Sequence, residues 1–281
     1  MDSNGLYPNL KQSIWLAFLL LVFQVAFGAV FGILFVIIKN DFDTVLISLF
    51  PTNLLSFGLV ILLVRNKTKH IWAETLQLFS FRYIIILPLF PLLIGLGIIA
   101  SEADNLLTYI MPKPELIQSF MADLATSGAS SIFLLGAVAP LTEEILFRGA
   151  ILKGLVNFYS PRKAVILSAI IFTLFHLNPY QFFSALTMGL FLGFLYLKTR
   201  SIIPCIIAHC IFNVHGIMLT LLFSIEISGY TLPSTFETVQ FQPVWLDLSG
   251  LALLIIGSLL LSKSLTPTLI DAEQGGADNA N

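Results

Sequence analysis

The sequence predicts an all-α fold, a polytopic membrane helix bundle of about eight transmembrane helices. Of the 281 residues, 57% are hydrophobic and 11% are charged. Soluble domains usually carry about 25% charged residues, so this composition is typical of a membrane protein. The mean hydropathy of +0.92 agrees with that reading. The net charge of −2 gives no indication of a nucleic-acid partner.

Eight apolar runs can be placed across a hydrocarbon layer of about 30 Å. They cover residues 14–38, 43–64, 83–110, 130–152, 164–178, 182–197, 201–224 and 245–262. The runs at 164–178 and 182–197 are short, and Asn178-Pro179 between them marks a tight turn. An alternative interpretation fuses these two runs into one re-entrant hairpin.

The segments outside these runs are also informative. The first run is longer than the apolar region of a cleavable signal, about 7–15 residues, so it is expected to stay as a membrane helix. Residues 112–128 are amphipathic and predict an interfacial helix. Residues 271–281 form a polar tail that is expected to be disordered. Cys205 and Cys210 share one apolar run and are expected to be buried thiols rather than a disulfide framework.

The loop charges predict the orientation. With a cytoplasmic N-terminus, the inner segments hold eleven basic residues, namely Lys11, Arg65, Lys67, Lys69, Arg82, Lys153, Arg162, Lys163, Lys198, Arg200 and Lys263. The outer segments hold only Lys39 and Lys113. The positive-inside rule therefore favours an integral multi-pass protein with its N-terminus in the cytoplasm. The short chain, without targeting extensions, is expected to belong to a bacterial plasma membrane.

Three spans carry polar side chains that a lipid-facing helix would not tolerate. They are Glu143, Glu144 and Arg148 on the fourth span, His176 on the fifth, and His209 and Asn213 on the seventh. At about 1.5 Å per residue from the inner helix ends, four of them fall in one layer. The estimated depths are about 15 Å for Glu143, about 20 Å for His176, about 14 Å for His209 and about 20 Å for Asn213. We therefore expect spans 4, 5 and 7 to form one site.

Three motifs occur in order on these spans: E-E-x-x-x-R at Glu143, Glu144 and Arg148, F-x-x-x-H at Phe172 and His176, and H-x-x-x-N at His209 and Asn213. In this combination the chain resembles the CAAX protease and bacteriocin-processing (CPBP, or Abi) family of intramembrane endopeptidases, and the type II CAAX prenyl endopeptidase in particular. The resemblance covers residues 80–225. It divides the chain into an N-terminal two-span region (1–82), a CPBP-like catalytic membrane core (83–225), and an outer loop, last span and polar tail (226–281).

The residue types suit peptide hydrolysis, which needs a water, a base and donors for the developing oxyanion. Glu143 is the candidate base, because a carboxylate becomes a stronger base in a low-dielectric site. His176 would share the water and protonate the leaving amine, and His209 and Asn213 would hold the water or the oxyanion. The resemblance implies the same division of work. The structural alternative for Glu143 is a neutral acid bonded to a backbone carbonyl.

The remaining residues of the motifs have supporting roles. Glu144 and Arg148 lie four residues apart and are expected to form an ion pair that orients the site. Phe172 is expected to pack against the site. Pro140 predicts either a simple kink or an opened helix turn before Glu143. His215 lies off the face of Asn213 and receives no role.

Metal dependence is left open by the sequence. Glu143, Glu144, His176 and His209 could hold zinc with an open position. However, the H-E-x-x-H motif is absent and each histidine stands on its own helix, so a metal-free water activated by glutamate is favoured.

Two other classes of function stay open: a proton-coupled transporter, whose midplane Glu and His would relay protons, and a non-catalytic membrane scaffold. The expected partners are membrane lipids and a peptide or protein substrate, which is either prenylated, membrane-inserted or unmodified. No nucleic-acid partner is expected.

Overall fold

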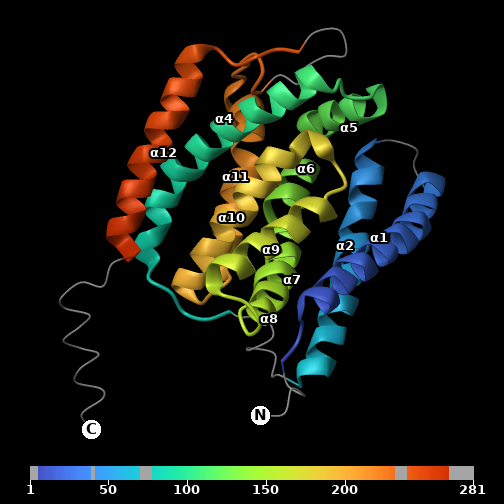
Figure 1. Ribbon diagram of the computed structural model, residues 1–281. Coiled ribbons are helices and arrows are strands. Elements are labelled where there is room, and N and C mark those ends of the chain that lie inside the picture. Colours follow the sequence, from blue (N-terminus) through green and yellow to red (C-terminus); the bar gives the residue numbers. More distant parts are fainter. Residues whose placement is uncertain (1–5, 39–41, 70–77, 232–238, 266–281) are drawn as a thin grey trace.

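The computed structural model describes residues 6–38, 42–69, 78–231 and 239–265, and the polar tail predicted at 271–281 lies outside them. In this part of the chain every regular element is helical, as predicted, and no strand forms (Figure 1). In chain order the elements are α1 (Leu10–Ile38), α2 (Phe42–Thr68), η2 (Tyr83–Ile85), α4 (Ile86–Ile110), α5 (Glu115–Thr126), α6 (Ala129–Phe133), η3 (Leu134–Val138), α7 (Ala139–Leu146), η4 (Phe147–Leu152), α8 (Lys153–Leu155), α9 (Pro161–Phe175), η5 (Pro179–Gln181), α10 (Phe182–Thr199), α11 (Ile203–Phe223) and α12 (Val244–Leu265).

Among the described residues, seven helical stretches are long and apolar enough to cross a membrane. They are Leu10–Ile37, Leu46–Thr68, Tyr83–Ile110, Ala129–Leu155, Pro179–Thr199, Ile203–Phe223 and Val244–Leu265. Many large apolar side chains on α1, α2 and α12 are exposed, which suits contact with lipid. The protein is an integral membrane helix bundle.

The predicted span at 164–178, the fifth in chain order, is not among these seven because α9 has only 15 residues. At about 1.5 Å per residue it measures about 22 Å, less than the thickness of the hydrocarbon layer. The helix ends because Leu177 takes a left-handed φ of 49° and Asn178 accepts a 3.1 Å hydrogen bond from the amide of Tyr180. Pro179 then starts the next turn. This early end leaves His176 at the tip of α9.

The helices pack in three groups (Figure 1). On one flank α12 lies along α4, and on the other α1 crosses α2, while α7 and α9–α11 lie between them. Glycines allow the close approach of α4 and α12: a Cβ atom added to Gly95 would lie 2.5 Å from the carbonyl oxygen of Gly250. The middle group carries the residues singled out from the sequence.

The bundle has two chemically different ends. We call "basic end" the end at which α1 starts, α2 ends, α9 starts, α10 ends and α12 ends; it is the lower end in Figure 1. It carries Lys11, Arg65, Lys67, Lys69, Arg82, Lys153, Arg162, Lys163, Lys198, Arg200 and Lys263. At the opposite end, α4 leads into the amphipathic helix α5, which lies within the predicted interfacial segment 112–128.

Candidate functional site

The helix that carries the two glutamates is interrupted twice by π-helical turns. The first, η3, precedes α7, and the second, η4, follows it. In η3 the amide of Ala139 bonds the carbonyl oxygen of Leu134, five residues earlier. The next bond of this type would join Pro140 to Leu135, but proline has no N–H. Asn213 of α11 supplies the missing donor, because its Nδ2 lies 3.0 Å from the Leu135 oxygen. Single π-helical turns of this kind are often found at functional sites.

Glu144 is the centre of a buried polar network. Its Oε1 accepts hydrogen bonds from Nη1 of Arg148 at 2.7 Å and from Nδ1 of His209 at 2.8 Å. Arg148 also donates from Nη2 to the carbonyl oxygen of Gly189 on α10, at 3.2 Å. The side chains of Glu144 and Arg148 are 0% and 1% exposed. Each charge therefore depends on the other, because a buried charge without a partner is strongly destabilising. The network ties α7, η4, α10 and α11 together.

The ring of Phe172 on α9 packs against three of the polar groups. The guanidinium carbon of Arg148 lies 4.7 Å from its centroid. The rings of His176 and His209 lie 4.7 Å and 5.9 Å from it, both edge-on. Phe172 is 1% exposed, so this contact is fully inside the protein. It holds the two imidazoles on neighbouring helices near one another.

The hydrogen bonds of the two histidines define which ring nitrogen is free. A carbonyl or carboxylate oxygen can only accept, so each Nδ1 in these bonds carries the proton. His176 donates from Nδ1 to the Phe172 carbonyl oxygen at 2.8 Å, and His209 donates to Glu144. Both Nε2 atoms are thereby left for other partners.

Glu143 lies next to the second of these nitrogens. Its Oε2 is 3.9 Å from Nε2 of His209. This separation is too long for a direct hydrogen bond. Oε2 of Glu143 is buried and, like Oε2 of Glu144, has no hydrogen-bond partner among the described residues. The Glu143 side chain as a whole is 12% exposed, whereas that of Glu144 is 0% exposed. The two adjacent glutamates thus have different surroundings.

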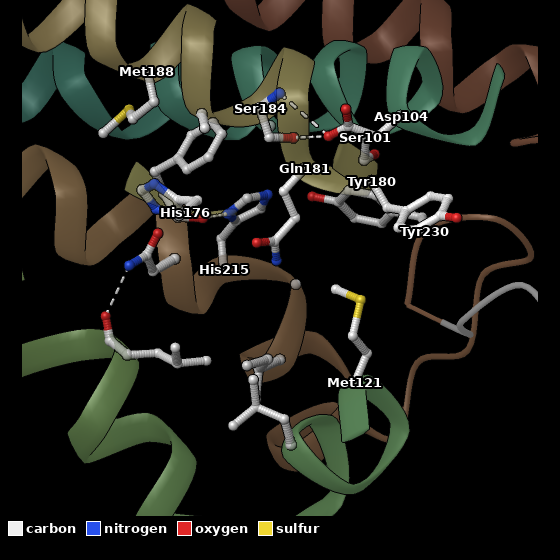
Figure 2. Close-up of a pocket in the computed structure, with 18 of the residues that line it drawn as sticks. Ser101, Asp104, Met121, His176, Tyr180, Gln181, Ser184, Met188, His215 and Tyr230 are labelled. Carbon is white, nitrogen blue, oxygen red and sulfur yellow. Dashed lines mark hydrogen bonds between the residues drawn. The ribbon is translucent and has the colours of Figure 1, made fainter. Parts of the chain in front are cut away.

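A cavity of about 360 Å³ lies beside this network (Figure 2). Four of the residues singled out from the sequence line it: Phe172, His176, His209 and Asn213. The lining does not include Glu143, Glu144 or Arg148. Glu143 lies behind the lining residue His209, with its Oε2 3.9 Å from Nε2 of that ring. A pocket of this size with a few convergent polar groups is typical of a small binding site.

The cavity also contains residues that the sequence analysis missed. Asp104 of α4 accepts hydrogen bonds from the amides of Phe183 and Ser184 and from the Ser184 hydroxyl, and so caps the start of α10. The signal was present, because "SEADN" at 101–105 interrupts an apolar span with acidic and amide side chains. Lys113 also lines the cavity, and its Nζ lies 5.9 Å from the centroid of the Tyr180 ring. Burial lowers the pKa of the Lys113 ammonium, and attraction to Asp104 opposes that shift.

His215, which received no role from the sequence, lines the same cavity (Figure 2). It donates from Nδ1 to the Phe212 carbonyl oxygen at 2.7 Å, and its ring lies 5.8 Å from that of Tyr230. The ring edge that contains Nε2 rests against Gly97 of α4, where an added Cβ atom would overlap it. The cavity reaches around α11, so residues on two faces of this helix line it. Helical periodicity along α11 alone could not reveal this.

The side chains of the site offer few free donors to a metal ion. Among the described residues, no group of three or more His, Cys, Asp or Glu side chains is arranged to hold one. Glu144 Oε1 already accepts from Arg148 and His209, and both Nδ1 atoms are bonded to protein oxygens. The other oxygen of Glu144, Oε2 of Glu143 and the two Nε2 atoms are not taken up in this way, but among the described residues they do not come together as a metal-holding group.

Comparison with known proteins gives two matches. Residues 125–215, which contain all three motifs, match the family model "Type II CAAX prenyl endopeptidase Rce1-like". The chain is 26% identical over 132 residues to the UPF0177 protein YxdF of Lactococcus lactis subsp. lactis (strain IL1403), covering 44% of this chain and 73% of that protein. No solved structure gives a significant match. These findings support a CAAX protease-like family for the chain, as the sequence motifs predicted.

Proposed function

We propose that this protein is an intramembrane endopeptidase that hydrolyses a peptide bond with a water activated by Glu143. The observation that carries the proposal is the 3.9 Å approach of Glu143 Oε2 to Nε2 of His209, which Glu144 holds in place from the other side. Such an arrangement resembles the way in which a carboxylate orients a histidine next to a reacting group. The match to a CAAX endopeptidase family supports the same reaction.

The reaction would proceed in two steps. A water between Glu143 and His209 gives a proton to the Glu143 carboxylate while its oxygen attacks the scissile carbonyl carbon. The second hydrogen on Nδ2 of Asn213, which is not used for Leu135, can donate to the oxyanion of the tetrahedral intermediate. When the C–N bond breaks, the proton passes to the leaving amine with the help of His176. The products are an amine and a carboxylic acid, which keeps the second proton of the water until it ionises.

We further propose that the reaction needs no metal. The commitment of Glu144 to Arg148 and His209 supports this, because two of the four possible ligands are then oriented by protein contacts. If zinc does bind, Glu143, Glu144, His176 and His209 are the residues to supply its ligands, and zinc would polarise the carbonyl and the water. The proposed setting is a bacterial plasma membrane with the N-terminus in the cytoplasm, in keeping with the basic residues at one end and the bacterial relative.

The test is a cleavage screen with purified full-length protein. Prenylated and unmodified peptides are incubated with the wild type, Glu143→Gln and the control Glu226→Gln, whose carboxylate is exposed outside the site, and products are identified by mass spectrometry. We expect Glu143→Gln to lose about 10²–10⁴-fold in rate and Glu226→Gln to retain the wild-type rate. Equal cleavage by wild type and Glu143→Gln would refute the proposal. In proteoliposomes, ion flux lost in Glu143→Gln without any peptide cleavage by the wild type would favour a transporter instead.

A further inference from the structure

The cavity is closed towards the basic end. On α7 and η4, the residues that follow the glutamates are fully buried, as Leu146, Phe147 and Ile151 show with 0% exposure each. On α10, Leu192 and Leu195 are also 0% exposed. On α11, Cys205 and Ala208, which precede His209, are 0% exposed, and so is Ile202 just before this helix. A packed apolar layer therefore separates the site from the basic end.

The cavity extends in the other direction. Its lining continues from His209 and Phe172 to the last turns of α4, to α5 and to the loop after α11. Asp104, Lys113 and Gln118 belong to that outer part. Figure 2 shows Tyr180 and Tyr230 on the same side as Asp104. The mouth thus lies at the end of the bundle opposite the basic end, and polar and charged groups line it.

The charges assign the two ends to the two sides of a membrane. Eleven basic residues lie at the basic end, whereas Lys113 is the only described Lys or Arg at the opposite end. Loops rich in Lys and Arg stay in the cytoplasm during membrane insertion. The basic end is then cytoplasmic, and the mouth of the cavity faces the outer aqueous phase.

We propose that the site receives its substrate from the outer side of the membrane, as a polypeptide segment that is exported or exposed on that face. This inference rests on the proposed peptidase function. A prenylated C-terminus of a cytoplasmic protein would meet the closed apolar layer instead of the mouth. The charged groups at the mouth, Asp104 and Lys113, also suit a hydrated peptide rather than an alkyl chain, because burying a charge against hydrocarbon is costly.

The first test measures sidedness without using activity. In a background with Cys205→Ala and Cys210→Ala, single cysteines are placed in the mouth (Met121→Cys) and at the exposed start of α9 (Arg162→Cys). Intact cells are treated with a sulfonated maleimide that does not cross membranes. We expect Met121→Cys to be labelled in intact cells and Arg162→Cys only after permeabilisation. The reverse pattern, or labelling of both in intact cells, would overturn the inference.

The second test uses the reaction. A peptide that the purified enzyme cleaves, coupled to a sulfonated dye, is added to sealed right-side-out and sealed inverted vesicles. Cleavage sensitive to Glu143→Gln is expected in right-side-out vesicles, and in inverted vesicles only after detergent is added. Cleavage in sealed inverted vesicles, with none in right-side-out ones, would overturn the outer-side inference and leave the peptidase proposal intact. Absence of cleavage even in detergent would refute the peptidase proposal instead, while the labelling result still decides the sidedness.

Discussion

Nδ1 of His209 lies 2.8 Å from Oε1 of Glu144, so a carboxylate on one helix determines how an imidazole on another is oriented. The bond directs the opposite nitrogen, Nε2, towards Glu143 at 3.9 Å. Two glutamates that are adjacent in sequence therefore stand on two sides of one histidine. Glu144 is held through Oε1 in a dry ion pair with Arg148, whereas Oε2 of Glu143 approaches His209 without a direct hydrogen bond. We therefore propose a structural role for Glu144 and a reactive role for Glu143.

This difference predicts two distinct phenotypes for the two glutamates. Glu144→Gln removes the charge partner of the buried Arg148, and we expect the free energy of unfolding to fall by about 3–5 kcal/mol. Glu143 has no such buried charge partner, so the Glu143→Gln variant should unfold at the wild-type temperature while losing activity. Thermal unfolding in detergent, followed by tryptophan fluorescence, measures both. Equal unfolding temperatures for the two variants would contradict the assignment.

A double variant provides the control for that experiment. Glu144→Gln combined with Arg148→Met removes both buried charges, so it should recover stability relative to Glu144→Gln alone. It should not recover cleavage, since His209 then lacks a charged partner for Nδ1.

The hydropathy of the chain was sufficient to predict the helical bundle, because apolar runs of about 20 residues have few alternatives to membrane helices. The short run at 164–178 was counted as an eighth span, but α9, with 15 residues, is not among the helices long enough to cross a membrane. The order of polar residues along the spans also indicated which helices meet. The roles assigned to these residues stay predictions.

The contacts that shape the site could not be predicted from the sequence. Pro140 indicated an opened turn or a kink, but the bond from Asn213 to Leu135 depends on how α11 packs against η3. Oε1 of Glu144 accepts hydrogen bonds from both Arg148 and His209, and the second of these bonds likewise depends on how α11 packs. His215 lines the cavity because the cavity reaches around its helix. These are relations between helices, whereas a periodic pattern reports only the faces of one helix.

The bond between Asn213 and Leu135 predicts a coupling with Pro140. Asn213→Ala leaves the Leu135 carbonyl without its donor and should lower the free energy of unfolding by about 1–3 kcal/mol. In a Pro140→Ala background, the new backbone N–H can bond this carbonyl, so the same change should be less costly. A double-mutant cycle by thermal unfolding measures the coupling. Additive effects would show that the two residues do not share this carbonyl.

Phe172 is predicted to position the imidazoles. Phe172→Leu keeps an apolar side chain but removes the contacts with Arg148, His176 and His209, at a cost of about 1–2 kcal/mol in stability. We expect kcat to decrease more than KM changes, since the ring touches the reacting groups rather than the outer part of the cavity. Phe194→Leu is the matched control, because Phe194 is exposed on α10 and should tolerate the change. A similar loss in both variants would argue against a positioning role.

Metal dependence has a direct test. We expect protein purified without added metal to contain far less than one equivalent of zinc by mass spectrometry and to retain its rate in EDTA. The reason is that Glu144, one of the four possible ligands, is already bonded to Arg148 and His209. Equimolar zinc that is lost together with activity on chelation, and restored by zinc alone, would overturn the metal-free mechanism.

The contact between Gly97 and His215 predicts that a single methyl group disturbs the cavity. A Cβ atom at residue 97 would overlap the His215 ring, which is held by its bond to the Phe212 carbonyl oxygen. The ring must then move into the cavity or α4 must move away, and overpacking of this kind costs about 1–3 kcal/mol. Gly58→Ala on α2 is the control: no atom lies within 4 Å of its added Cβ, and alanine favours a helix over glycine by about 1 kcal/mol.

We therefore expect Gly97→Ala to lower both the unfolding temperature and the cleavage rate, and Gly58→Ala to leave the rate unchanged and raise the unfolding temperature slightly. Gly97→Ala combined with His215→Ala should regain stability, because the smaller side chain removes the overlap. If the double variant also regains the cleavage rate, His215 acts only by filling space. If stability returns and the rate does not, the imidazole itself contributes to substrate binding in the cavity.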